Sequence, residues 1–252
     1  MSGVKAIFIT VRSASKRLPN KAHLTINNKK TIEYVIEQAK KSKLADTIVL
    51  CTTLNPEDEA LCRIAEKNNI KYFRGSTDDK LDRWLHAAKE NNVDFFVTAD
   101  GDDLFCSYEL MDLAFQQRER NNSDFIQGQG LASGSFTYGI STKALTRACQ
   151  IKDTDQTEMM WVYFTETGIC KVEELENVPS TYFRDDVRMT LDYEEDFVFF
   201  KTVIGSLSQD FDTRDVLSFL NKNPKVVEIN YFLQDAWKHN QQMKTTLELN
   251  DE

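Results

Sequence analysis

Short apolar runs alternate with amphipathic stretches along the first half of the chain. The apolar runs are rich in β-branched and aromatic residues, which is typical of buried strands. These predicted strands are residues 4–11, 47–51, 71–73 and 94–98. Between them, apolar residues recur at helical spacing. The predicted helices are one with Thr31 as its N-cap, one that begins at Pro56, and two over residues 80–90 and 108–120.

The second half of the chain alternates less regularly. Its predicted strands are residues 125–127, 136–140 and 187–191. Its predicted helices are residues 143–149, 157–167, 194–206, 213–221 and a last one that begins at 232 and ends near 243. This order predicts an α/β protein whose mostly parallel sheet is covered by helices on both faces. No flexible linker divides the chain, so we expect one domain over residues 1–252, in which residues 136–184 are a candidate substrate or dimerisation lobe.

Acidic residues outnumber basic ones, with 40 Asp and Glu against 31 Lys and Arg and a formal net charge of -9. This balance argues against nucleic acid or an anionic membrane as a partner. No segment resembles a signal peptide and no apolar run is long enough to span a bilayer, which predicts a cytoplasmic protein. The five cysteines form no CxxC pair and the three histidines lie far apart, so we expect free thiols and no zinc site.

One segment carries the opposite charge. RSASKRLPNK, residues 12–21, holds four basic residues and no acidic one, directly after the first predicted strand. Ligands of open α/β sheets bind at the carboxyl ends of strands. The chain contains no P-loop, no complete GxGxxG and no GxSxG motif. Side-chain cations instead of a glycine cradle therefore predict a small anionic ligand, and they suit a triphosphate.

Acidic residues follow two other predicted strands. Asp100, Asp102 and Asp103 lie in TADGDD after the third long strand, so we expect them at the same edge of the sheet as the basic segment. Asp192 follows the predicted strand 187–191. A triphosphate usually brings Mg²⁺, which prefers a few carboxylate oxygens, so both groups are candidate metal ligands. The alternative for the first group is an acidic turn, and the two glutamates after Asp192 are expected to begin a helix.

These segments together resemble a known family. RSASKRLPNK is similar to the R-x-x-S-x-R-L-P-x-K loop of the cytidylyltransferases that activate acidic sugars, such as the CMP-sialic acid and CMP-Kdo synthetases. The similarity is greatest to their spore-coat polysaccharide (SpsF-type) branch. CTTLNPED, FRGSTDDKLDRW, MTLDYEEDF and FLNKNPKVVEIN resemble further motifs of that branch in the same order. The resemblance therefore covers nearly the whole chain.

The resemblance implies a three-layer, Rossmann-like nucleotide-diphospho-sugar transferase fold and a Mg²⁺-dependent reaction. A hydroxyl of an acidic sugar or related small acid would attack the α-phosphate of CTP, and pyrophosphate would leave. By their positions in the motif, the residues that would hold the triphosphate are Arg12, Ser15, Arg17 and Lys21. Asp102 and Asp192 would bind Mg²⁺, and together with Arg12 and Lys21 they are the expected catalytic residues.

Further contacts to nucleotide or acceptor are expected from Arg74, Asp100, Gln127 and Glu158. Arg83 has two open assignments, because it could face the acid group of the acceptor or pair with a neighbouring aspartate. The aromatic residues of MMWVYF are Trp161, Tyr163 and Phe164, and we expect them in the core of a helix or in the contact of a homodimer, which the family favours.

Three positions depart from the family pattern. Ala14 and Asn20 replace glycines, and Leu104 stands where a proline normally follows the Gly-Asp motif. Asn20 tolerates a positive φ better than most residues. Two other functions stay open: a GT-A-like glycosyltransferase with Asp100 and Asp102 as its metal motif, and a catalytically inactive nucleotide-binding relative. The basic segment argues against the first, because a sugar-nucleotide donor carries only a diphosphate.

Overall fold

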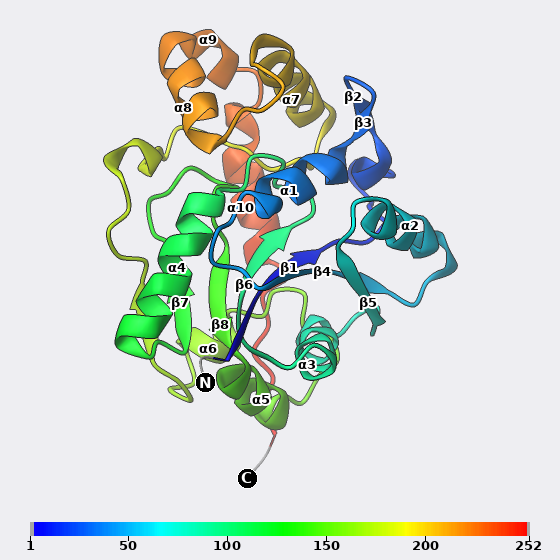
Figure 1. The fold of residues 1–252 in the computed structure, drawn as a ribbon, viewed down its shortest axis with the longest axis vertical. Helices are drawn as coiled ribbons and strands as arrows, with labels where there is room; N and C mark the ends of the chain where they lie inside the picture. The colour runs from blue at the N-terminus through cyan, green and yellow to red at the C-terminus, as the bar shows by residue number, and fades with distance from the viewer. Residues whose placement is uncertain (1–2, 251–252) are drawn as a thin grey trace.

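A seven-stranded sheet runs through the middle of the computed structural model, which describes residues 3–250 (Figure 1). In spatial order its strands are β5 (Lys71–Gly75), β4 (Thr47–Thr53), β1 (Val4–Thr10), β6 (Val93–Asp100), β8 (Tyr138–Ser141), β7 (Phe125–Gln127) and β9 (Val172–Glu174). Strand β8 is antiparallel to both neighbours, and every other neighbouring pair is parallel. A separate hairpin consists of β2 (Thr25–Ile26) and β3 (Lys29–Lys30). The predicted mostly parallel α/β sheet is confirmed.

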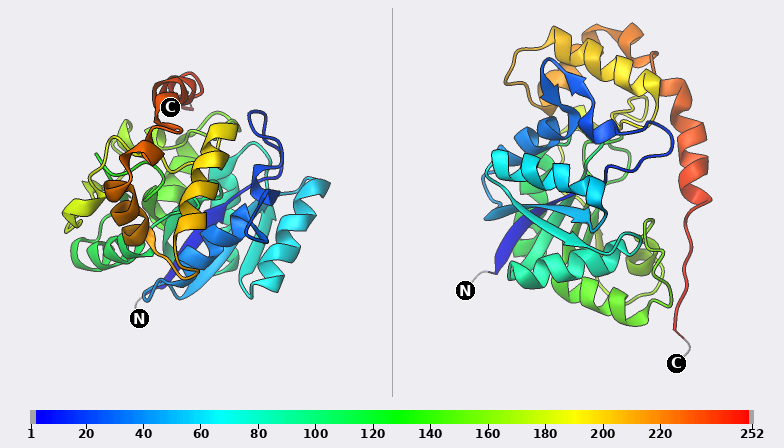
Figure 2. Two further views of the ribbon diagram at one scale, coloured as in Figure 1. Left: turned by 90° about the horizontal axis from the view of Figure 1, so that it is seen from above. Right: turned by 90° about the vertical axis from the view of Figure 1, so that its right-hand side faces the viewer.

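Helices cover both faces of the sheet (Figure 2). The α-helices are α1 (Thr31–Lys40), α2 (Glu59–Lys67), α3 (Lys80–Glu90), α4 (Tyr108–Asn121), α5 (Thr142–Ile151), α6 (Val162–Thr165), α7 (Glu194–Ser206), α8 (Thr213–Lys222), α9 (Pro224–Val227) and α10 (Gln234–Gln242). The 3-10 helices are η1 (Lys21–His23), η2 (Pro56–Asp58), η3 (Ser180–Tyr182) and η4 (Tyr231–Leu233). Among the described residues, no helix is both long enough and apolar enough to cross a membrane.

The core divides into two clusters because successive strand residues point to opposite faces of the sheet. In β1, Ile7 and Ile9 belong to the cluster beneath α1, α4, α7 and α8, whereas Ala6 and Phe8 belong to the cluster beneath α3 and α5. All four side chains are fully buried. Strand β1 therefore has no solvent-facing side, which explains its continuous apolar run. All five cysteines are free, as expected.

Two predicted elements were wrong in the second half of the chain. Residues 187–191 are extended and largely buried, but they form only an isolated bridge with Ser133, to whose carbonyl oxygen Met189 N donates over 2.9 Å. These residues run alongside the loop that contains Ser133, and they do not add a strand to the sheet. The helix predicted at residues 157–167 is reduced to α6, and the residues before it belong to the wall of a cleft.

Two smaller differences concern the start of α1 and the edge of the sheet. Thr31 is the first residue of α1 and not its cap; Lys30 takes the cap position, and the Thr31 hydroxyl donates to the carbonyl oxygen of Lys21. Strand β9 was not predicted, because its sequence Val-Glu-Glu is short and charged, as edge strands often are. Residues 136–184 contribute β8 and β9 to the main sheet, so this region is continuous with the rest of the fold.

A buried ion pair attaches α7 to the extended residues before it. Arg188 Nε and Nη2 donate to the two carboxylate oxygens of Asp196 over 2.9 and 3.0 Å, and both side chains are fully buried. The Asn230 amide donates to Asp196 over 2.9 Å, and Arg188 Nη1 donates to Gln234 over 3.2 Å. Two parallel hydrogen bonds and additional polar partners offset the desolvation of the two charges.

We expect Arg188→Met to lower the free energy of unfolding by about 3–5 kcal/mol, because the Asp196 carboxylate stays buried without its partner. Urea unfolding followed by circular dichroism measures this change. Arg214→Met is the control, because Arg214 forms a partly exposed pair with Glu109 and should cost only about 0–1 kcal/mol. Equal losses in the two variants would contradict a structural role for the buried pair.

Candidate active site

A cleft of about 1430 Å³ lies where β1 and β6 end. The two strands are parallel, with Thr10 beside Asp100 at their carboxyl ends. The basic segment and the acidic turn therefore start next to each other, as expected for segments that follow neighbouring parallel strands. The remaining walls come from residues in 77–84, 128–138, 156–161, 190–193 and 237–244.

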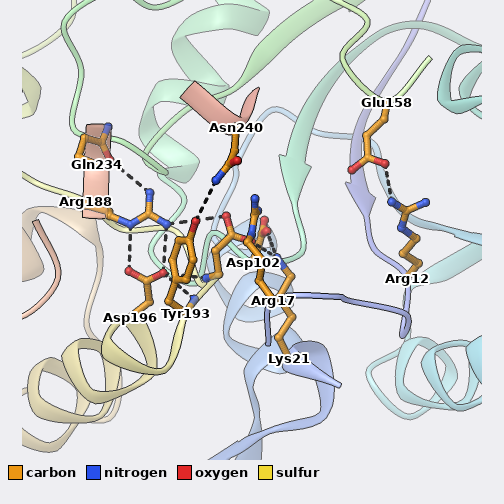
Figure 3. Close-up of polar contacts among 11 residues, drawn as sticks. Arg12, Arg17, Lys21, Asp102, Glu158, Arg188, Tyr193, Asp196, Gln234 and Asn240 are labelled. Carbon is orange, nitrogen blue, oxygen red and sulfur yellow. Dashed lines mark hydrogen bonds and ion pairs between the residues drawn. The ribbon is translucent and has the colours of Figure 1, made fainter. Parts of the chain in front are cut away.

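Lys21 connects two carboxylates from distant parts of the chain (Figure 3). Its Nζ donates to Asp192 Oδ1 over 2.7 Å and also donates to Asp102. Arg17 Nη2 lies 2.7 Å from the same oxygen of Asp192. Burial opposes ionisation of Asp192, but Lys21 and Arg17 outweigh it and hold the pKa of this carboxyl well below its usual value. Four of the predicted site residues are thus in mutual contact.

Asp100 and Asp103 have the opposite electrostatic behaviour. Burial raises the pKa of both carboxyl groups, and the charge of Asp102 raises them further. Lys80 Nζ, 3.9 Å from Asp100, opposes the shift at Asp100 only in part. The acidic turn therefore has more carboxylates than its neighbouring cations compensate, and an additional bound cation would relieve the repulsion.

Asp58 holds the start of the basic segment. Its carboxylate is fully buried, accepts a hydrogen bond from Ser13 N over 2.7 Å and accepts another from the Thr53 hydroxyl. Burial favours the neutral acid, but the hydrogen bonds from Thr53 and Ser13 prevail and lower the pKa of Asp58. At the other end of the segment, Asn20 has a φ of 55°, in the left-handed region. The asparagine at the family's glycine position thus takes a conformation that it tolerates.

Arg12 and Ser15 also line the cleft. Arg12 pairs with Glu158 from the opposite wall, and its Nη1 donates to the carbonyl oxygen of Thr77 over 3.5 Å (Figure 3). Both members of the Arg12–Glu158 pair are partly exposed, so the pair contributes little to stability. The Arg12 guanidinium can therefore leave Glu158 for an anionic ligand at low cost.

Arg74 and Gln127 do not line the cleft. Arg74 pairs with Glu59 over 2.8 Å and also donates to the carbonyl oxygens of Thr53 and Asn55. Gln127 donates to Glu174 over 2.7 Å. Because the hydrogen-bonding groups of both side chains are engaged elsewhere, this placement gives no support to their predicted substrate contacts, and the site proposed below does not include them.

Arg83 lines the cleft and is 5% exposed. It forms no ion pair with any described residue, so the pairing with a neighbouring aspartate is not found. Its Nη1 donates to the carbonyl oxygen of Ser76, whereas its Nε has no partner in the described part of the chain. Burial lowers the pKa of Arg83, which means that the charge is poorly compensated. An anion in the cleft would stabilise it.

The three aromatic residues before and within α6 have different environments. Tyr163 and Phe164 are fully buried in the core cluster beneath α3 and α5, as one of the two predictions stated. Trp161 lines the cleft. Tyr163 and Phe164 are therefore unavailable as contacts of a dimer.

Asp102 and Asp192 are suited to hold Mg²⁺. Both contact the single ammonium group of Lys21, so their oxygens converge on a position that a cation occupies. Within residues 3–250 no group of three His, Cys, Asp or Glu side chains is arranged as a metal site. Mg²⁺ needs no such group, since it is usually bound by one or two carboxylates together with substrate phosphates and water.

Helix α10 is a part of the cleft wall that the sequence did not indicate. Trp237 and Gln241 of α10 line the cleft together with Lys244, which follows the helix, although the helix was predicted without a role. The signal in the sequence is the spacing of four residues between Trp237 and Gln241, which places these two on one helix face. That spacing is found in many surface helices, so only the position of α10 beside the cleft makes it informative.

Comparisons with known proteins agree with this geometry. A family model described as cytidylyltransferase matches residues 6–233. An uncharacterised protein of Methanocaldococcus jannaschii is 34% identical over 229 residues, which are 88% of this chain and 92% of the relative. The spore coat polysaccharide biosynthesis protein SpsF of Bacillus subtilis is 23% identical over 86% of this chain and 93% of its own. The solved structure of a cytidylyltransferase from Leptospira borgpetersenii has a TM-score of 0.81 and 27% identity, covering 90% of this chain and 97% of that one.

We expect Asp58→Ala to lower the free energy of unfolding by about 2–3 kcal/mol, because it leaves buried donors without an acceptor. Asp58→Asn keeps one acceptor oxygen and should lose less. Since the folded state lowers the pKa of Asp58, its carboxylate stabilises the protein above the unfolded pKa of about 4, and this contribution is lost as the pH falls. Urea unfolding between neutral and acidic pH should show the wild type and Asp58→Asn converging below about pH 4. A difference independent of pH would contradict the anchoring role of the charge.

Proposed function

Because the chain belongs to the cytidylyltransferase family, we propose that it transfers CMP from CTP to a hydroxyl group of an acidic sugar or a related small acid. The protein is a CTP-dependent nucleotidyltransferase. The nature of the acceptor and the use of Mg²⁺ are the parts that we propose. The observation that carries the proposal is the contact of Lys21 with both Asp102 and Asp192 in the cleft behind the basic segment.

Residues of the basic segment bind the nucleotide in this proposal. Arg12, Ser15, Arg17 and Lys21 bind the triphosphate of CTP. Arginine forks and an ammonium group neutralise its oxygens and stabilise the charge that develops on the leaving pyrophosphate. The acceptor oxygen forms a bond to the α-phosphorus as the bond from that phosphorus to the pyrophosphate oxygen breaks. The hydroxyl proton is released to water in the same reaction.

Asp102 and Asp192 hold Mg²⁺ in this proposal, and Asp100 adds negative charge beside them. When bound, the metal ion polarises the phosphate oxygens and neutralises their charge. Lys21 neutralises both aspartates in the structure, and its ammonium group would pair with phosphate if a metal ion were bound by them. Nucleotidyl transfer depends mainly on positioning and charge neutralisation, and this arrangement of carboxylates and cations can supply both.

The charges in the cleft support an acidic acceptor. Eight lysines and arginines line the cleft against six carboxylates, in a chain with a net charge of -9. The basic segment contributes four of these cations, so further cations are available to a second anion. Glu158 lines the same cleft as these further cations, and we propose that it contacts the substrate. The similarity to the spore coat relative, which acts in polysaccharide biosynthesis, favours a sugar acid.

A homodimer, which the family resemblance favours, is part of the same proposal, as is a location in the cytoplasm. Size-exclusion chromatography with light scattering distinguishes a dimer from the 29.1 kDa single chain.

The nucleotide is tested first by thermal shift with CTP, UTP, GTP, ATP and UDP-glucose, each with Mg²⁺. A ligand at about 100 times its Kd stabilises the folded state by roughly 2.7 kcal/mol, which raises Tm by several degrees. We expect a shift with CTP and none with UDP-glucose. A shift with UDP-glucose alone would favour a glycosyltransferase, and no shift with any nucleotide would favour an inactive relative.

We expect Asp192→Asn to lower kcat about 10²–10³-fold, by analogy with the loss of other groups that stabilise transition-state charge. Pyrophosphate release from CTP in the presence of acidic sugars measures the rate. Glu195→Gln is the control, because Glu195 is an exposed residue in the first turn of α7 and should leave the rate unchanged. Full activity of Asp192→Asn would remove this residue from the proposed metal site.

A further inference from the structure

Helix α10 begins directly after residue 233, where the match to the family ends. We call residues 234–250 the C-terminal strap. It runs along one side of the molecule, from the C-terminal helices toward α5 (Figure 2). Residues of the strap line the cleft together with residues of the basic segment and the acidic turn. The strap is therefore a wall of the site that lies outside the segment matched by the family.

The strap is attached at both ends. At its start, Gln234 accepts a hydrogen bond from Arg188 Nη1 over 3.2 Å, and the Arg188 guanidinium lies 5.2 Å from the centroid of the Trp237 ring. At its far end, Asn250 N donates to the carbonyl oxygen of Ile151 over 2.9 Å. The first attachment is to the buried Arg188–Asp196 pair, and the second is to the end of α5. The segment between them is thereby held against the cleft.

The strap presents three different polar groups to the cleft. Trp237 and Gln241 lie one turn apart on one face of α10, and Lys244 lies in the turn that follows the helix; all three line the cleft. Trp237 Nε1 and Gln241 Oε1 are shielded from solvent and have no hydrogen-bond partner among residues 3–250. A buried donor or acceptor without a partner costs free energy, so a ligand that supplies the partner is favoured. On the outer face, Met243 is 72% exposed.

Lys244 supplies a cation opposite Glu158. Burial opposes the ionisation of Glu158, but Arg12, Lys80 and Lys244 together lower its pKa. Lys244 and Glu158 both line the cleft, so the charge of Lys244 acts on this carboxyl group. Within α10, the Asn240 amide donates to the Tyr193 hydroxyl over 3.4 Å, and Tyr193 follows Asp192 directly in the chain (Figure 3). The strap thus contacts the segment of a candidate metal residue and lines the same cleft as Glu158.

A free donor, a free acceptor and an ammonium group match a particular chemistry. Hydroxyl groups both accept and donate hydrogen bonds, so they fit Trp237 Nε1 and Gln241 Oε1. A carboxylate or phosphonate fits the ammonium group of Lys244. The volume of about 1430 Å³ exceeds the roughly 300–1,000 Å³ of a usual small-molecule pocket, so the cleft has room for a second substrate beside CTP.

We propose that the C-terminal strap binds the acceptor, with Lys244 paired to its acid group and Trp237 and Gln241 bound to its hydroxyl groups. The expected ligand is a small polyhydroxylated acid. This inference rests on the proposed function and assigns the half of the site that the basic segment does not occupy. The strap residues are specificity-determining residues: they select the acceptor and leave the binding of CTP unchanged.

The test compares wild type, Lys244→Met and Trp237→Leu in a pyrophosphate-release assay. The acceptor probes are 3-deoxy-manno-octulosonic acid, N-acetylneuraminic acid and glucuronic acid, and the best of them is also used as its methyl ester. Calorimetry with CTP and Mg²⁺ gives the Kd of the nucleotide for each protein. Two controls are Lys225→Met, an exposed lysine of α9, and His239→Gln, on the solvent side of α10.

We expect Lys244→Met to raise KM for the acid about tenfold while kcat and the Kd of CTP change less than about twofold, because the pair forms equally in the ground and transition states. The methyl ester should have the same KM with wild type and Lys244→Met, since it lacks the charge that Lys244 binds. Trp237→Leu should also raise KM for the acid, and both controls should behave as wild type.

Two results would overturn the inference while leaving CTP binding intact. One is turnover of an acid with the same KM in wild type and in both strap variants. The other is binding of CTP by the wild type without turnover of any of the three acids. If the wild type does not bind CTP, the proposed function fails and the inference fails with it.

Discussion

The Lys21 ammonium group donates to Asp102 and Asp192, which are 81 and 171 positions away along the chain. It thereby joins the basic segment, the turn after β6 and the segment before α7 at one point. Close carboxylates repel one another unless a cation lies between them. Arg17 adds a second cation at Asp192, and the pKa of that carboxyl is correspondingly low. The arrangement of these three segments therefore depends on cations that neutralise Asp102 and Asp192. A nucleotide bound with a metal ion would change the charge around the same two carboxylates.

A continuous set of contacts leads from the core to this point. The buried Asp196 carboxylate accepts from Arg188 and also from the backbone N–H of Asp192 over 2.8 Å. The first turn of α7, the Asp192 backbone and the start of α10 at Gln234 are therefore fixed by one buried ion pair. This pair lies outside the cleft, yet it orients a candidate metal ligand and attaches the strap. Arg188 therefore stabilises the fold and also positions residues of the candidate site.

Much of the first half of the fold could be predicted from the sequence. Strand β1 is an uninterrupted apolar run because both of its faces are covered, and helix α3 covers the residues that its periodicity predicted. The basic segment and Asp102 could be placed at one edge because parallel strands end together. The segment 187–191 shows the limit of this reasoning. Its apolar residues predicted a strand, but their burial comes from packing and an isolated bridge to Ser133.

The sequence by itself determined the family, the order of the main-sheet strands and of the α-helices in the first half, and the charge of the nucleotide segment. The tertiary structure alone decided which candidates face the cleft. Arg74 and Arg83 stand nine positions apart in one motif, yet Arg74 pairs with Glu59, while Arg83 is buried at the cleft and forms no ion pair with a residue of the described range 3–250. Lys244 likewise acquires its position because the strap is held at both ends. The local sequence shows whether a side chain is apolar or charged, whereas long-range packing determines which neighbouring residue buries it or pairs with it.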